Sequence, residues 1–103
     1  MAKPKSSKAA LLNDYRIFET EQFQSDLRSN LGRHGEKIIA KLQNDVYPQL
    51  RQQLFFGHNI KKLKGYRPDT WRYRIGMYRF FYEIDDCRKI IFMLAAATRQ
   101  NSY

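Results

Sequence analysis

Residues 71–85, Trp71-Arg-Tyr-Arg-Ile-Gly-Met-Tyr-Arg-Phe-Phe-Tyr-Glu-Ile-Asp85, decide the fold that this sequence predicts. On both sides of Gly76-Met77, apolar residues largely alternate with charged ones, which is the pattern of two half-buried strands around a turn. A connection this short makes the two strands antiparallel neighbours. We therefore expect a hairpin of strands over 71–75 and 78–85.

Further strand patterns flank this hairpin. Residues 89–98 follow it after a turn at Asp85-Asp86-Cys87-Arg88, and residues 59–66 precede it as an additional edge segment. Much earlier, Tyr15-Arg16-Ile17-Phe18 also alternates and predicts a first strand. The sheet is therefore expected to combine one strand from the start of the chain with the strands of its second half.

Between the first strand and the rest, the apolar spacing becomes helical. Phe23, Leu27 and Leu31 recur every fourth residue, with Thr20 as the expected N-cap and Gly32 as the stop.

A second helical pattern runs from Glu36 to Leu54. Pro48 lacks a backbone donor and predicts a kink or break within it. The order β-α-α-β-β-β predicts an α+β domain over residues 15–103, with two N-terminal helices on one face of a small curved, mainly antiparallel sheet. Residues 1–14 are expected to form a basic flexible arm.

Composition limits the classes of protein to consider. With 103 residues the chain suits one domain, and its 43% hydrophobic content excludes general disorder. No apolar run approaches the roughly 18 to 20 residues of a membrane span, so we expect a cytoplasmic protein without a membrane partner. Cys87 is the single cysteine, and neither an HExxH motif nor a carboxylate cluster is present. No metal or other cofactor is therefore expected.

The net charge of +9 indicates a polyanionic partner. Seven lysines and arginines lie between Gly57 and Arg79, against Asp69 alone among acids, and they alternate with aromatic residues. This pattern favours nucleic acid as the partner of the central block.

The second half of the chain resembles the RelE/ParE superfamily of toxins from type II toxin–antitoxin systems. The similarity rests on Asn59-Ile-Lys-Lys-Leu-Lys-Gly-Tyr66, on Trp71-Arg-Tyr-Arg-Ile-Gly76 followed by Tyr78-Arg79, and on Arg99 with Tyr103 four residues later. The resemblance covers about residues 15–103 and points to the RelE-like branch, whose members cut messenger RNA in the ribosomal A site. It implies that the catalytic residues are Lys62, Lys64, Arg72, Arg99 and Tyr103.

Cutting RNA without a metal requires a base for the 2′-hydroxyl, positive charge at the crowded phosphorane and help for the leaving 5′-oxygen. The products are a 2′,3′-cyclic phosphate and a 5′-hydroxyl. Period-2 geometry puts Lys62 and Lys64 on one face of their strand, and Arg72 and Arg74 on one face of theirs. Together they would clamp a phosphate. The remaining cations that we expect to bind RNA are Lys61, Arg67, Arg74 and Arg79.

The individual roles follow from side-chain chemistry. An ordinary lysine is a poor base at neutral pH, but neighbouring positive charges lower a lysine's pKa. We therefore assign Lys62 or Lys64 as the base and leave the choice open. Arg72 would brace the phosphorane as a planar fork, and Arg99 would assist the leaving oxygen electrostatically. Tyr103 would stack on a base or share the proton transfer.

Two departures from the superfamily pattern bear on this scheme. Position 98 is Thr where many relatives carry His, which places more of the proton transfer on the lysines. Tyr103 is the last residue given, so its α-carboxylate would lie near the cationic site. A two-histidine site of His34 and His58 is disfavoured, because nothing in the sequence brings them together.

Two rival functions remain at this stage. A ParE-like protein would inhibit DNA gyrase, but the retained cations and terminal tyrosine argue against it. An inactive RNA-binding module would carry the same cations without a usable base. The leading hypothesis is a toxin that cleaves mRNA, with the ribosome and a cognate antitoxin as partners.

Overall fold

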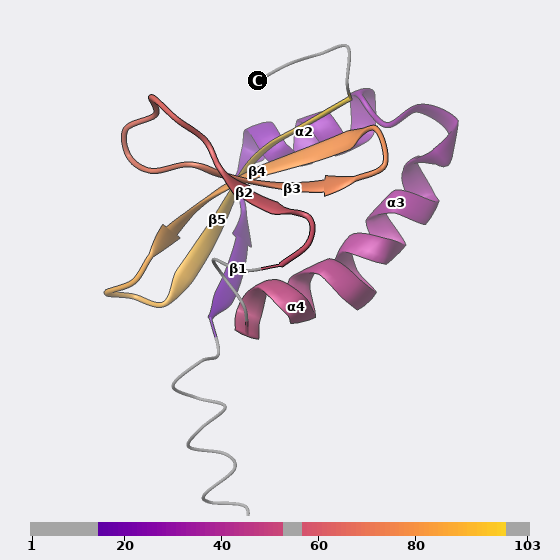
Figure 1. The fold of residues 1–103 in the computed structure, drawn as a ribbon. Coiled ribbons are helices and arrows are strands. Elements are labelled where there is room, and N and C mark those ends of the chain that lie inside the picture. Colours follow the sequence, from indigo (N-terminus) through magenta and orange to yellow (C-terminus); the bar gives the residue numbers. More distant parts are fainter. Residues whose placement is uncertain (1–14, 53–56, 99–103) are drawn as a thin grey trace, which may run out of the picture.

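The computed structural model describes residues 15–52 and 57–98. Strand β1 (Arg16–Glu19) leads into helix α2 (Glu21–Ser29) and a 3₁₀ turn (Gly32–His34). Helix α3 (Gly35–Lys41), a π-helical turn (Leu42–Val46) and helix α4 (Tyr47–Gln52) form one curved rod beside the sheet (Figure 1). Strands β2 (Ile60–Lys62), β3 (Trp71–Ile75), β4 (Tyr78–Asp85) and β5 (Ile90–Thr98) complete the described fold.

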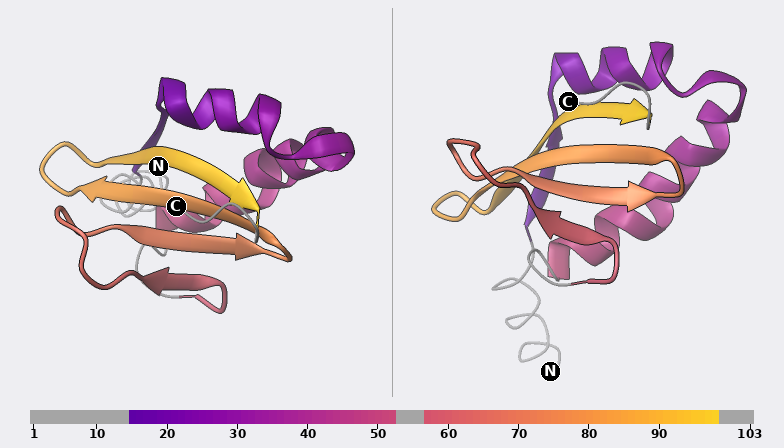
Figure 2. Two further views of the ribbon diagram at one scale, coloured as in Figure 1. Left: turned by 90° about the horizontal axis from the view of Figure 1, so that it is seen from above. Right: turned by 45° about the horizontal axis from the view of Figure 1, so that its top comes forward.

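The strands form one mixed five-stranded sheet in the order β1-β5-β4-β3-β2 (Figure 2). β1 pairs with β5 in parallel, and all other pairs are antiparallel. The predicted hairpin is confirmed, with Ile75 opposite Tyr78 at its turn. The additional edge segment is also present, although β2 spans only 60–62 of the expected 59–66. The α+β fold of helices on a small, mainly antiparallel sheet is confirmed.

The hydrophobic core lies between the helices and one face of the sheet. Phe23, Leu42 and Leu50 from the helical layer pack with Phe80, Tyr82, Ile91 and Met93 from the strands, and all of them are almost fully buried. Burying this apolar surface is the main favourable contribution to folding.

Two polar side chains fix α2 to β5. Thr20 caps α2 as expected, because its hydroxyl accepts the Phe23 N–H, and it also donates to the carbonyl of Met93 at 2.8 Å. The buried carboxylate of Asp26 accepts the backbone N–H of Ala96 at 2.9 Å. The Ala96 contact lies beyond a register shift in the β4–β5 ladder, at Phe81/Tyr82.

Pro48 does not end the helical rod. It lies in the first turn of α4, where a missing backbone donor is tolerated, and five residues of π-helix precede α4. At the place where a kink or break was predicted, the rod therefore changes its helical winding, from π-helix to α-helix at Tyr47, without ending. No helix in the described ranges is long and apolar enough to cross a membrane. The predicted basic arm and the end of the second helical pattern at Leu54 lie outside the described residues.

Candidate functional site on the open face of the sheet

The face of the sheet opposite the helices carries a separate set of side chains. Because successive residues of a strand point to opposite faces, the burial of Tyr73 and Phe80 in the core turns Arg72, Arg74, Arg79 and Phe81 to the other side. There Phe81, Ala95 and Ala97 form a small second cluster with Leu63, and no helix residue of the described ranges belongs to it. We call this surface the open face.

Cross-strand register arranges the open face in two rows. Lys61 lies opposite Arg72, which lies opposite Phe81, and Phe81 lies opposite Ala95. The second row begins with Arg74 opposite Arg79, and Arg79 lies opposite Ala97. Directly opposite residues project from the same face, so four cations share it.

Arg72 is a half-buried cation of the open face. Its Nε atom is buried and has no hydrogen-bond partner among the described residues. Burial lowers the pKa of the Arg72 guanidinium, and the nearby positive charges of Arg79 and Arg74 lower it further. An arginine in this setting lacks a counter-ion. An anion seated on the open face would supply both the missing acceptor and the missing charge.

The hairpin turn extends the cationic surface. Arg74 and Arg79, with Gly76 and Met77, line a hollow of about 260 Å³ at this end of the face. Directly opposed like charges destabilise a sheet, so the geometry is favourable only when an anion is close. A chain of phosphates is an anion that can lie across both rows at once.

Lys62 and Lys64 lie apart from Arg72. Lys62 is opposite Trp71, so its strand position belongs to the face that carries the core, and its Nζ pairs with Asp69 at 3.2 Å. Lys64 follows β2 and is exposed. Together with Arg67, these lysines line a hollow of about 610 Å³ in the β2–β3 loop.

The structure thus brings the predicted cations together in two groups. Lys61, Arg72, Arg74 and Arg79 share the open face, and Lys62, Lys64 and Arg67 surround the loop hollow. Lys61, which was predicted only to bind RNA, is the lysine beside Arg72. Arg99 and Tyr103 lie outside the described residues.

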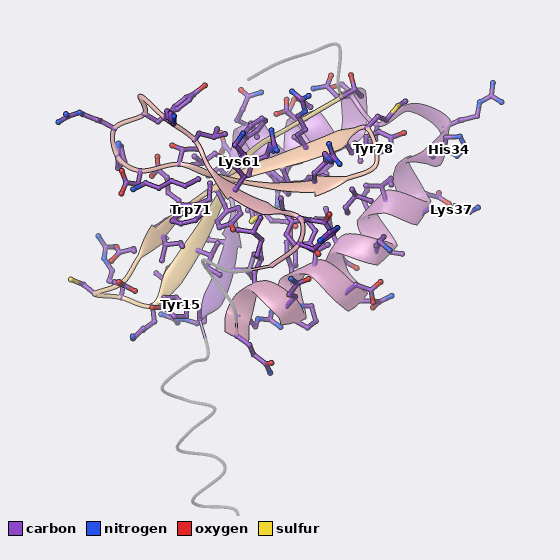
Figure 3. The ribbon with its side chains drawn as sticks, viewed as in Figure 1. Tyr15, His34, Lys37, Lys61, Trp71 and Tyr78 are labelled. Carbon is purple, nitrogen blue, oxygen red and sulfur yellow. The ribbon has the colours of Figure 1, made fainter. Side chains whose placement is uncertain are left out.

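Residues outside the cationic block do not enter this site. His34 lies in the 3₁₀ turn at the far end of the helical layer, well separated from Lys61, as is its neighbour Lys37 (Figure 3). Glu83, which was not among the residues predicted from the sequence, stands on the open face two residues beyond Phe81. The alternation of Arg79, Phe81 and Glu83 along β4 is the signal that could have identified it.

The fold has close counterparts among solved structures. The RelBE2 toxin–antitoxin complex of Mycobacterium tuberculosis contains a chain that is 22% identical, with a TM-score of 0.62 over 84% of this chain and 99% of that one. For the archaeal RelE–RelB complex of Pyrococcus horikoshii the identity is 25% and the TM-score 0.52, over 85% and 98%. For the RelB–RelE complex of Methanococcus jannaschii the values are 26% and 0.54, over 81% and 91%. No protein-family description and no curated protein sequence matches the chain.

These likenesses define the class to which the fold belongs, the small α+β toxins of toxin–antitoxin systems. Within that class the chain has the fold of the RelE-like toxins, as the motifs of its strands indicated.

Proposed function

We propose that this chain is an endoribonuclease toxin that cleaves messenger RNA without a metal, in the ribosomal A site. The observation that carries the proposal is Arg72, half-buried on the open face with its Nε unsatisfied and surrounded by Lys61, Arg74 and Arg79. None of these four cations has a carboxylate partner in the described part of the chain. Preorganised positive charge of this kind stabilises a phosphorane, whose negative charge grows in the transition state.

The proposed reaction begins with attack of a ribose 2′-oxygen on the adjacent phosphorus. The 2′-proton passes to a base, the bond from phosphorus to the 5′-oxygen breaks, and the 5′-oxygen takes up a proton as it leaves. A 2′,3′-cyclic phosphate and a 5′-hydroxyl result. In this scheme Arg72 holds the non-bridging oxygens, and Arg74 and Arg79 bind the RNA backbone beyond them.

The base is proposed to be a lysine. The superfamily resemblance favours Lys62 or Lys64, and the position of Lys61 opposite Arg72 adds a third candidate. Arg99 is assigned to the leaving oxygen, and Tyr103 to base stacking or proton transfer, on the resemblance alone. Replacing each lysine singly with alanine distinguishes the roles, because loss of the base lowers kcat whereas loss of a phosphate contact mainly weakens RNA affinity.

Two partners follow from this function. The similar M. tuberculosis and M. jannaschii proteins were solved as toxin–antitoxin complexes, and we propose that an antitoxin with an acidic segment neutralises the open face. We further propose that the ribosome positions the message. A cationic surface alone binds RNA weakly and in a strongly salt-dependent way.

Primer extension on a translated message tests the proposal. Wild type should produce discrete cuts, and Arg72→Ala should reduce the cleavage rate by about 100-fold or more, the usual cost of removing one transition-state donor. Arg28→Ala is the matched control, because it removes an arginine from the exposed surface of α2. Folded wild-type protein that leaves the message intact would refute the nuclease function. Equal cleavage by wild type and Arg72→Ala would remove Arg72 from the mechanism.

A further inference from the structure

A notch of about 560 Å³ opens between the β2–β3 loop and the β4–β5 hairpin. Both connections project to the left in Figure 1. Phe92 and Glu83, which lie opposite each other on the open face, line the notch together with Trp71, which also packs against the core. The volume lies within the range of small-ligand sites, which typically combine an apolar lining with a few polar groups.

Three other carboxylates line this notch, and each already has a partner. Asp69 pairs with Lys62 at 3.2 Å, and Asp85 pairs with Arg88 at 3.2 Å. Asp86 accepts the hydroxyl of Tyr15. These contacts account for the negative charge of the two loops.

Glu83 differs from these three carboxylates, because it makes no hydrogen bond or ion pair within the described part of the chain. It is half-buried, and burial raises the pKa of its carboxyl. A carboxylate with little water around it gains more from ligand N–H donors than a fully hydrated one does. The notch therefore offers aromatic surface beside one carboxylate that has no partner among the described residues.

The position of Glu83 relates the notch to the cationic rows. Glu83 lies opposite Phe92 and two residues along β4 from Phe81, which is itself opposite Arg72. Two residues of a strand span roughly 7 Å. A nucleotide whose phosphate lies on Arg72 therefore has its base within reach of Glu83.

We propose that the notch binds one base of the RNA, a guanine adjoining the phosphate on Arg72, with Glu83 accepting its N1–H and N2–H donors. Guanine alone among the RNA bases offers two neighbouring donors with no acceptor between them, which matches the two oxygens of a carboxylate. Phe92, directly opposite Glu83 on the open face, supplies the aromatic surface against which such a base packs. This assignment rests on the proposed nuclease function and makes Glu83 the residue that determines base preference.

Nucleotide binding tests the assignment independently of cleavage. Full-length wild type titrated with 3′-GMP and 3′-AMP, followed by NMR, should bind the guanine nucleotide about tenfold more tightly. Glu83→Gln should abolish or reverse that preference, because an amide pairs with adenine instead. Glu36→Gln, the same change at an exposed position of α3, is the control and should keep the preference. Equal affinities in wild type, or a preference that Glu83→Gln leaves intact, would overturn the proposal.

Mapping of cut sites separates this proposal from the proposed function. Wild type should cut next to guanine more often than chance, and Glu83→Gln should shift the cuts towards adenine. Cleavage with the same base distribution in both proteins would refute the role of Glu83 and leave the nuclease standing. Binding of 3′-GMP without any cleavage would support the role of Glu83 and refute the nuclease function. Weaker antitoxin binding by Glu83→Gln, with nucleotide preference unchanged, would assign the notch to a basic side chain of the protein partner.

Discussion

Arg74 and Arg79 face each other across the β3–β4 ladder, on the face of the sheet that no described helix covers. They are held together by the backbone of the hairpin and not by each other, since like charges at directly opposed positions repel. The pair therefore costs stability in the free protein and becomes favourable only when a polyanion is bound.

Replacing one member of this pair should separate stability from function. Arg74→Gln is expected to raise the free energy of unfolding by about 0.2–1 kcal/mol, because a like-charge repulsion is removed. The same change should weaken binding to single-stranded RNA and lower the slope of log affinity against log salt by about 0.7. Urea unfolding and salt-dependent binding measure the two effects, and a loss of stability together with unchanged RNA affinity would contradict this interpretation.

Breaking the ion pair between Lys62 and Asp69 should have the opposite effect on RNA binding. Both side chains are more than half exposed, at 53% and 66%, so the ion pair contributes little to stability. Asp69→Asn should change the free energy of unfolding by no more than about 0.5 kcal/mol. It should strengthen RNA binding, because Lys62 loses its internal counter-charge and becomes available to a phosphate. Weaker binding by Asp69→Asn would show that Asp69 positions Lys62 instead of competing with RNA for it.

Asp26 is expected to stabilise the fold and to take no part in RNA cleavage. Asp26→Ala leaves the Ala96 N–H without its acceptor at a buried site and should destabilise the protein by about 1–3 kcal/mol. Asp45→Ala, which removes only an exposed partner of Lys41, is the control and should cost less than about 0.5 kcal/mol. Denaturant unfolding of both variants gives the comparison, and equal losses would contradict the anchoring role of Asp26.

The buried hydroxyl of Tyr47 should contribute to the fall in the free energy of unfolding at alkaline pH. Its hydroxyl donates to Glu19 at 2.6 Å, and burial, followed by this hydrogen bond, raises the pKa of Tyr47 above its ordinary value of 10.0. The folded protein holds this proton more tightly than the unfolded chain, so the resulting stability is present below pH 10 and is lost as the pH rises beyond it.

Tyr47→Phe should accordingly flatten the decline in the free energy of unfolding above pH 10. Urea unfolding at several pH values between about 9 and 11 provides the measurement. An unchanged slope in Tyr47→Phe would show that other groups control the alkaline limit.

Periodicity was enough to predict the hairpin, the cap at Thr20 and the α+β class, because alternation and helical spacing are local properties of the sequence. It could not decide which lysine accompanies Arg72. The segment before β3 carries lysines at 61, 62 and 64, and a slip of one residue exchanges the two faces of a strand.

The contact of Asp26 and the setting of Glu83 were also beyond sequence reasoning. The carboxylate of Asp26 accepts a hydrogen bond from a backbone N–H 70 residues later in the chain. That N–H lies near a register shift that has no signature in the local sequence. Glu83 stands out, as a carboxylate without a partner in the described ranges, only after its acidic neighbours are seen to have partners.

The parallel pairing of β1 with β5 determines when the domain can be completed during synthesis. Thr20, which follows β1, donates to the carbonyl of Met93, 73 residues later in the chain. This hydrogen bond cannot form before that part of the chain has been synthesised. Until β5 emerges, β1 and α2 have no sheet to dock on, and the open face lacks the alanines beneath Phe81. A nascent chain therefore completes the sheet, and with it the apolar support beneath the cationic rows, only after β5 has been made.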